Sequence, residues 1–521
     1  MIWTIARKEF FEKMLDFRVI VSFVIAIVLT ATATYVAADS YRVKKAEYDQ
    51  LLRNNQDELK EAKVYSQFKP VVCYPPSPLS IFSQGIDVPT PITVPIALDE
   101  VPQYRPTAAG ANPIMSIFEK LDIAIVIRVL FSLLVILLTF DAFSGEKESG
   151  TLRQTLSNPV TRVALFAGKL AGTILVLAAV VALTFLTTLL VLRLSSEVSF
   201  GMSDMVRITG VALATMIYLA FFALLGMLIS LLFQHSSTSL VVLLFSWFFL
   251  AVFQPNLNTY VVSEAGGTGW IQTAQAGMAS ADCGVYDELE KYEKDHGDPR
   301  SDRSKPMYFG GPGASKSQYY GTFSLYPEVT DADFGVLQYL IGQIQIYRKF
   351  GDCAERSFNA YRTYYRSHLE RQLRFKRALD LFSPAALYSR SAAVLSMTDA
   401  DNLESFLDAA RQYRTAYVGF LDRKGLFSSN AQLYFSRLSR DQIDKTATDE
   451  RMARYRQDPE SVPYLSKAPP LDLSDAPVFA WRQTDPGDDV REGARTLFPL
   501  YALIMALCAL TVWRLRSYDP R

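Results

Sequence analysis

Six long runs of apolar residues constrain the fold of this 521-residue chain more than any other feature. A bilayer core of about 30 Å requires roughly 20 apolar residues in a helix, and a helix satisfies its own backbone hydrogen bonds in lipid. The runs therefore predict six transmembrane helices and an all-α polytopic membrane protein. We place the spans at residues 17–38, 121–140, 170–192, 208–233, 236–253 and 497–513.

The lysine and arginine residues near the span ends predict the orientation, because cytoplasmic loops carry an excess of both. Basic residues precede the first span, lie between the second and third, and follow the sixth. Arg193 and Arg207 depart from this pattern, since they flank a short loop predicted to lie outside. The orientation makes a loop at 141–169 and a tail at 514–521 cytoplasmic. It puts two large segments outside, at 39–120 and 254–496.

The two outer segments contain more than half of the chain. The first begins with a helical pattern over Tyr41–Phe68 and continues as a proline-rich stretch, 70–113, that we expect to be extended. The second predicts a large, mainly α-helical extracytoplasmic domain, with one helix stopping at Ser383-Pro384 and another over 399–422. The latter helix has an apolar face formed by Leu403, Phe406, Leu407, Ala410, Tyr413 and Tyr417. Residues 440–495 show no pattern that places an element.

Residues 1–16 form an amphipathic helical pattern before the first span. Trp3, Phe10 and Met14 share one face of it. An aromatic face beside basic residues suits a helix that lies in the membrane interface. The alternative is that these residues are the first turns of span one. Asp16 and Arg18 interrupt the apolar run and favour a separate interfacial helix.

The predicted cytoplasmic loop contains a compact charged motif, in which two glycines bracket Glu146, Lys147 and Glu148. Thr151 is suited to cap a following helix, and Asn158-Pro159 is suited to end it. Short helices held by two spans could dock into a groove on a soluble partner and transmit its motion to the membrane. The alternative is a solvated loop that only connects the spans.

Two features inside the spans predict close contacts. Arg128 is a charge well inside the second span, where insertion costs roughly 2.5–3.5 kcal/mol unless the side chain finds a partner or reaches the interface. It either extends toward the outer interface or has a functional role, such as lining a cavity or pairing across a dimer. Gly168 and Gly172 have the spacing that permits close helix packing, which we expect within one subunit rather than at a dimer contact.

The sequence predicts no catalytic, cofactor-binding or metal-binding site. Residues 310–317 differ by one residue from a nucleotide-binding loop, but no suitable strand precedes them and they are predicted outside. The four cysteines lack metal-binding spacing; Cys283 and Cys353 could pair or remain free thiols. Acidic and basic residues balance at 53 each, which disfavours a nucleic-acid partner. We therefore expect the chain not to be an enzyme.

The charged loop and the start of the third span resemble the ABC-2 type permeases, the membrane subunits of one class of ATP-binding-cassette transporter. The motif is carried by Glu146, Lys147, Glu148, Gly150, Thr151, Leu152, Pro159, Thr161, Arg162, Gly168 and Lys169. The N-terminal helix resembles the interfacial elbow helix of that family. The outer segment is similar to a subgroup with a helical extracytoplasmic domain, at 381–385 and at Thr398-Asp399.

The resemblance implies a permease in the bacterial cytoplasmic (inner) membrane that pairs with a second permease, as a homodimer or heterodimer, and with separate cytoplasmic ABC ATPase subunits. ATP and Mg²⁺ would bind in the partner ATPase, and residues 146–152 would be the coupling helix. The implied ATPase interface comprises Glu146, Lys147, Glu148, Gly150, Thr151, Leu152, Pro159 and Arg162.

The resemblance implies export of a substrate, and we expect this substrate to be hydrophobic or amphipathic, because spans three and four are nearly uncharged. One alternative is a mechanotransmitter, in which ATP hydrolysis reshapes the outer domain for assembly, maturation or motility of an extracytoplasmic protein partner. Another is a membrane-anchored binding protein without an ATPase, against which the cytoplasmic motif argues.

Overall fold

The computed structural model of the protein describes residues 2–62, 68, 70–85, 92–96, 102, 122–157, 160–194, 200–266, 285–296, 346, 356, 371, 374–424 and 471–517. The expectations for Pro159, for the two cysteines Cys283 and Cys353, and for 310–317 fall outside these residues.

Six helices of the described chain are long and apolar enough to cross a membrane, so the mainly helical membrane fold is confirmed. Four are single helices: α2 Phe17–Glu61, α7 Arg162–Leu194, α8 Met202–Leu232 and α18 Pro486–Ser517. The second comprises α3 Ile123–Val126, the π-helix η4 Ile127–Phe131 and α4 Ser132–Thr139. The fifth comprises α9 Ser236–Trp247 and the π-helix η5 Phe248–Phe253, and it continues as α10 Gln254–Gly266.

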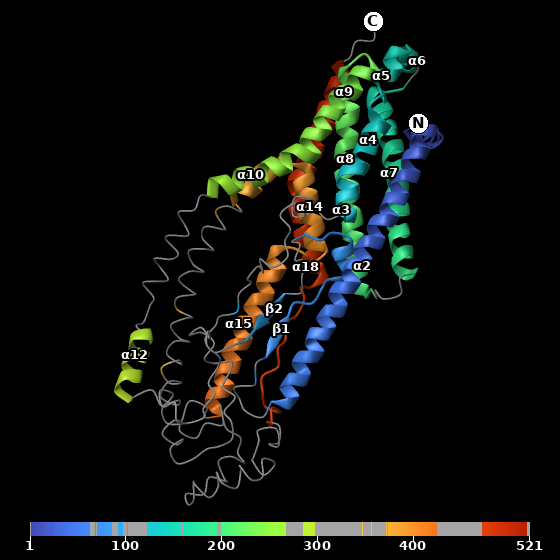
Figure 1. The fold of residues 1–521 in the computed structure, drawn as a ribbon. Helices are drawn as coiled ribbons and strands as arrows, with labels where there is room; N and C mark the ends of the chain where they lie inside the picture. The colour runs from blue at the N-terminus through green and yellow to red at the C-terminus, as the bar shows by residue number, and fades with distance from the viewer. Residues whose placement is uncertain are drawn as a thin grey trace, which may run out of the picture.

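The other described elements gather mainly at the two ends of this bundle (Figure 1). One end, here called the α5–α6 end, carries α1 Ile2–Met14, α5 Ser144–Glu148, α6 Thr151–Ser157 and both termini. The opposite end, here called the α15 end, carries β1 Val71–Cys73, η2 Pro78–Ile81, β2 Thr93–Pro95 and α15 Ala400–Arg423. Helix α14 Pro384–Leu395 lies among the spans and leads into this end. The short helix α12 Val285–His296 lies apart from the bundle (Figure 1).

Helix α8 lies at the centre of the bundle, because it packs against α18, α7, α4 and α14. Its side chains Tyr218 and Phe222 are completely buried, and their rings meet edge to face. Helix α2 packs against α7 instead and leaves much of its apolar surface exposed. Burial of the α8 face therefore supplies much of the core around which the other spans are arranged.

Three helix boundaries differ from those expected. Helix α2 continues past the predicted span without a break and ends at Glu61, short of the expected end at Phe68. Helix α7 begins at Arg162, so the last part of the predicted loop is helical. Helix α18 begins at Pro486, well before 497, because Asp485 accepts the N–H of Gly487 at 3.1 Å and proline is favoured in the first helical turn.

The α15 end has its own small core. Asp399 caps α15, and the expected apolar face packs there, with Phe406 and Tyr417 buried. The proline-rich stretch crosses this face as an antiparallel ribbon in which Val72 lies opposite Val94. The expectation of extended chain is therefore correct for the ribbon but missed its strand pairing and the 3₁₀ turn η2. The Tyr417 hydroxyl fixes the ribbon further by donating to the Phe68 carbonyl at 2.8 Å.

Helix α14 packs within the transmembrane bundle, although its sequence falls inside the segment predicted as an outer domain. Ser383 caps its start, which agrees with the expected boundary at Ser383-Pro384. Tyr388 is completely buried and stacks on Tyr218 of α8 with ring centroids 4.7 Å apart. Leu395 lies against Gly493 of α18. The outer segment and the spans thus share one core, since a helix rich in alanine and leucine gains more by burial among apolar helices than by exposure.

Candidate functional site

Helices α5 and α6 form a short corner that is fixed to the bundle. The hydroxyl of Ser230, near the end of α8, accepts the N–H groups of Phe143 and Ser144, each at 2.9 Å. Gly150 joins the two helices at φ +74°, a left-handed conformation that glycine adopts without steric cost. The corner therefore has a defined geometry rather than that of a solvated connector.

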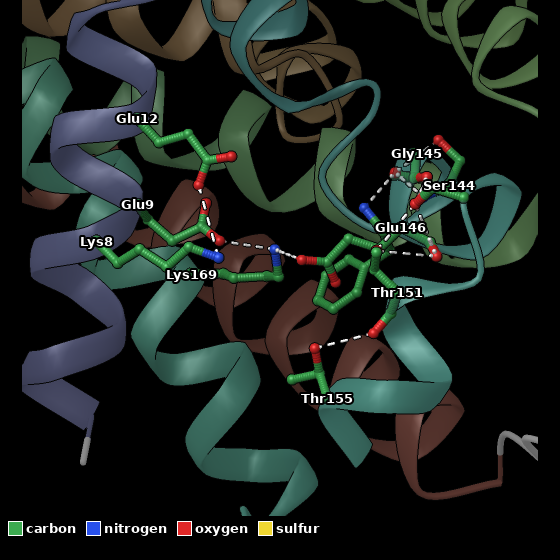
Figure 2. Close-up of polar contacts among 12 residues, drawn as sticks. Lys8, Glu9, Glu12, Ser144, Gly145, Glu146, Thr151, Thr155 and Lys169 are labelled. Atoms are coloured by element: carbon green, nitrogen blue, oxygen red, sulfur yellow. Dashed lines mark hydrogen bonds and ion pairs between the residues drawn. The ribbon is translucent and has the colours of Figure 1, made fainter. Parts of the chain in front are cut away.

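Lys169 of α7 joins three elements at this corner (Figure 2). Its side chain is 4 % exposed, and its Nζ lies 2.7 Å from Glu9 Oε1 of α1 and 2.8 Å from Glu146 Oε1 of α5. A buried ammonium group requires such compensation, because an unpaired charge is costly to remove from water. The interaction fixes the positions of α1, α5 and α7 relative to one another.

The next two charges of the motif contact two other helices. Lys147 Nζ donates to the carbonyls of Leu231 and Phe233 at the C-terminal end of α8, the latter at 3.2 Å. Glu148 accepts the N–H of Ser236 at 3.1 Å and its hydroxyl at 3.0 Å, where α9 begins. A cation at a helix C-terminus and an anion at a helix N-terminus both complement the helix dipole. Three consecutive charged residues thus contact different helices. Glu146 contacts α7 at the ion pair that α7 shares with α1, Lys147 contacts α8, and Glu148 contacts α9.

These contacts change the interpretation of the charged motif. Glu146 and Lys147 do not extend freely toward a partner, as expected, but point at neighbouring helices. Thr151 is the first residue of α6 rather than its cap, and it donates to the Glu146 carbonyl at 3.4 Å. Leu152 is buried, at 1 % exposure. The exposed polar surface of the corner comprises Glu148, Ser149, Gly150, Thr151, Arg153, Gln154 and Ser157.

Arg162 connects the same region to the last span. Its Nη1 donates to the Leu515 carbonyl at 3.3 Å and also to that of Arg516, at the C-terminal end of α18. Positive charge at a helix C-terminus is stabilising. With this contact, the region around α5 and α6 holds the ends of α7, α8, α9 and α18 together.

Helix α1 lies directly on α7 over the two glycines. A Cβ atom at Gly168 would come within 2.7 Å of the Ile5 Cβ, and one at Gly172 within 2.7 Å of the Glu9 Cβ. The glycine pair therefore serves packing within this chain. Lys13 continues the contact by donating to Thr173 Oγ1 at 2.7 Å, and burial lowers the pKa of its ammonium group to about 8.

The apolar face expected for the N-terminal helix is divided in the structure. Phe10 and Met14 pack against the bundle core, whereas Trp3 is 68 % exposed. The other exposed apolar side chains of this region are Ile2, Phe11, Leu15 and Phe17. The exposed apolar surface of this helix therefore includes Trp3 but not Phe10 and Met14, because the close approach to α7 turns these two inward.

The charges expected to be unusual in or beside the spans lie far from this corner and have contacts within the chain. Arg128 lies on η4, and its Nη1 is 3.4 Å from Ser389 Oγ of α14. Its cavity-lining and dimer roles stay predictions. Arg207 Nε lies 2.7 Å from Asp489 Oδ2 of α18, with both residues buried. This pairing accounts for a basic residue on the side where the charge rule disfavours one.

Sequence reasoning missed Glu9, Ser230 and the Arg207–Asp489 pair. A signal existed for Glu9, since Lys169 begins an apolar run and requires a carboxylate from another element. No comparable signal existed for Ser230, because its partners are backbone N–H groups that only the folded chain brings within reach.

The helical bundle and its polar corner define the class of protein. It is a multi-pass α-helical membrane protein in which several spans are joined at the α5–α6 corner. A family model described as an ABC-2 family transporter protein matches residues 3–282. The chain belongs to this family, and it is an ABC-2 permease, the membrane subunit of an ABC transporter. A domain of unknown function, DUF3526, matches residues 318–460. No curated protein matches the chain.

Proposed function

We propose that this permease uses the α5–α6 corner to receive the motion of separate ABC ATPase subunits, which bind ATP and Mg²⁺, and that it exports a hydrophobic or amphipathic substrate. In this proposal the α5–α6 end is cytoplasmic, the α15 end is extracytoplasmic, and the membrane is the bacterial inner membrane. A second permease copy completes the complex.

The observation that carries the proposal is the set of contacts made by α5. Glu146 binds Lys169 of α7, Lys147 and Glu148 bind the ends of α8 and α9, and nearby Arg162 binds the end of α18. A force applied to the exposed face of α6 would be transmitted to all of these helices, because the charged contacts couple each of them to the corner. Rigid-body movement of packed helices is a common form of such a switch.

The nature of the substrate is inferred from the buried polar groups of α7 and α8. Away from the span ends, these are mainly threonines, and Thr184 and Thr215 donate to carbonyls of their own helices at 2.8 and 2.9 Å. Hydroxyls that are satisfied in this way do not line a hydrophilic path. A hydrophobic or amphipathic substrate is therefore more compatible with these helices than an ion or a sugar.

A mechanotransmitter is the second candidate, and α14 favours it. This helix packs against α8 and α18, and the link that follows it leads directly into Asp399, the cap of α15. Movement of the spans would therefore be passed to the α15 end, where a partner protein could be remodelled without any transport.

The test is ATPase stimulation in a reconstituted complex with the Arg153→Glu variant. We expect reduced stimulation and a melting temperature close to that of wild type, since Arg153 is exposed on α6 and exposed ion pairs contribute about 0–1 kcal/mol. Arg193→Glu, at the other end of α7, is the matched control and should behave as wild type. Full stimulation by Arg153→Glu would argue against docking at α6. Uptake of labelled substrate into inverted vesicles would separate export from mechanotransmission.

A further inference from the structure

A cavity of ≈ 90 Å³ lies where α2 leaves the predicted first span. Its walls come from α2, from the proline-rich stretch around η2, and from the link between α14 and α15. One water molecule needs roughly 10–15 Å³ on the same scale, so the cavity has room for a polar group of several atoms.

The walls of this cavity are held in a demanding backbone conformation. Met397 has φ 56°, which is unusual for a residue with a side chain. Gly85 has φ +55° and lies so close to the Thr398 carbonyl that a Cβ atom there would be 2.3 Å from its oxygen. Ser77 Oγ donates to the Ser396 carbonyl at 2.8 Å and closes the contact between the two segments. Strain of this kind persists where the surrounding structure enforces it, often at binding sites.

The cavity wall carries a neutral acceptor, a carboxylate and an ammonium group. Gln84 Oε1 is buried and has no hydrogen-bond donor among the described residues. Asp399 adds a carboxylate to the same wall, and burial raises the pKa of this group. Lys44 of α2 contributes an ammonium group, while Ala37 on the same helix provides an apolar surface toward the span. Buried acceptors normally have a donor, so the Gln84 oxygen points to a ligand with N–H or O–H groups.

We propose that this cavity binds the headgroup of a phospholipid of the phosphoethanolamine class. The phosphate would contact Lys44, and the ammonium group would donate to Gln84 Oε1 and to Asp399. The acyl chains would follow α2 into the bilayer. A choline headgroup would bind poorly, because its nitrogen has no N–H to donate. This proposal is independent of the direction of transport and of the ATPase interface.

Native mass spectrometry of the full-length permease, titrated with short-chain lipids, tests the proposal. One phosphatidylethanolamine should bind per chain, at least about tenfold more tightly than phosphatidylcholine or phosphatidylglycerol. Lys44→Gln and Gln84→Leu should each weaken binding by about tenfold. Lys45→Gln is the matched control, because Lys45 is adjacent to Lys44 in the sequence but does not line the cavity. This variant should bind lipid as wild type does.

Several results would overturn the assignment. Equal binding of all three lipids, or unchanged binding by Gln84→Leu, would exclude recognition by this wall. Equally tight binding of free phosphoethanolamine would show a site for a soluble zwitterion rather than for lipid. Melting temperatures of each variant without added lipid check the fold. If one variant melts early, Ser40→Phe replaces it: filling the cavity from α2 should abolish binding, and normal binding would contradict the proposal.

Discussion

At the residue scale, the charged motif combines attachment and exposure within a few positions. Glu146 reaches Lys169, whereas Arg153 on the following helix is exposed. The inward residues fix the corner, and the exposed residues form its outer surface. Substitutions in the motif therefore fall into two groups: those that disturb the fold and those that disturb only docking. A charge reversal at Glu146 belongs to the first group, so lost ATPase stimulation in that variant would not by itself show a docking contact.

Lys169→Met is predicted to destabilise the permease by about 3–5 kcal/mol, because the buried Glu9 and the partly exposed Glu146 would lose their shared cation. Thermal unfolding of the purified protein measures the effect. Lys8→Met is the control, since the Lys8–Glu12 pair is exposed at 3.8 Å and such pairs contribute about 0–1 kcal/mol. Similar melting temperatures for the two variants would show that the buried contact does not hold the corner.

The pKa of Lys13 predicts a pH dependence of stability. Burial lowers this pKa from 10.5 to about 8, so the folded state disfavours the charged form. The resulting penalty is complete below pH 8 and disappears as the pH rises toward 10.5, with an upper limit of roughly 3 kcal/mol. Wild type should therefore gain more stability than Lys13→Met between pH 7.5 and 10. Parallel melting curves for the two proteins over this range would contradict the prediction.

At the element scale, the sequence was sufficient where an element follows from local chemistry. Six apolar runs indicate six spans, and Ser383 and Asp399 indicate helix starts by their capping side chains. Contacts that depend on distant segments were not predictable. The packing of α14 among the spans depends on Tyr218 and Gly493, which are remote in sequence from Tyr388 and Leu395. The strand pairing of the proline-rich stretch likewise required the surface of α15.

Two glycine-to-alanine changes are predicted to differ in effect, one at Gly172 where α1 packs on α7 and one at Gly210 where α8 meets α14. At Gly172 a new Cβ would meet the Ala6 carbonyl oxygen at 2.9 Å, so backbone must shift, at a cost of about 1–3 kcal/mol. At Gly210 it would meet only the end of the Leu395 side chain, at 2.9 Å. Gly172→Ala should therefore lower the melting temperature, whereas Gly210→Ala should leave it unchanged or raise it through better helix propensity. The reverse order would show that α1 is not packed tightly on α7.

At the scale of the whole molecule, charged contacts brace both ends of the bundle. The Lys169 contacts and Arg162 hold the α5–α6 end, and the buried Arg207–Asp489 pair holds α8 to α18 at the other. Between them, α14 extends the core from the spans to the link that precedes α15. Movement at one end would therefore be transmitted as displacement of whole helices rather than dissipated in loops.

The candidate site was predictable in position but not in orientation. Its residues stand together in the sequence, so a charged loop between two spans was evident. The inward direction of Glu146 and Lys147 depends on Lys169 and on the carbonyls that end α8, which only folding brings together. Leu152 is inward for the same reason, since it fills a small core beside Phe143 and Leu165.

Site-specific cross-linking in the assembled complex tests the central claim most directly, that the exposed face of α6 contacts the ATPase subunit. Arg153→Cys, with the native cysteines replaced, should form a cross-link to the ATPase that changes in yield when nucleotide is added. Arg495→Cys, exposed near the opposite end of α18, should form none. A cross-link from Arg495→Cys, or none from Arg153→Cys in a complex that still hydrolyses ATP, would contradict the account.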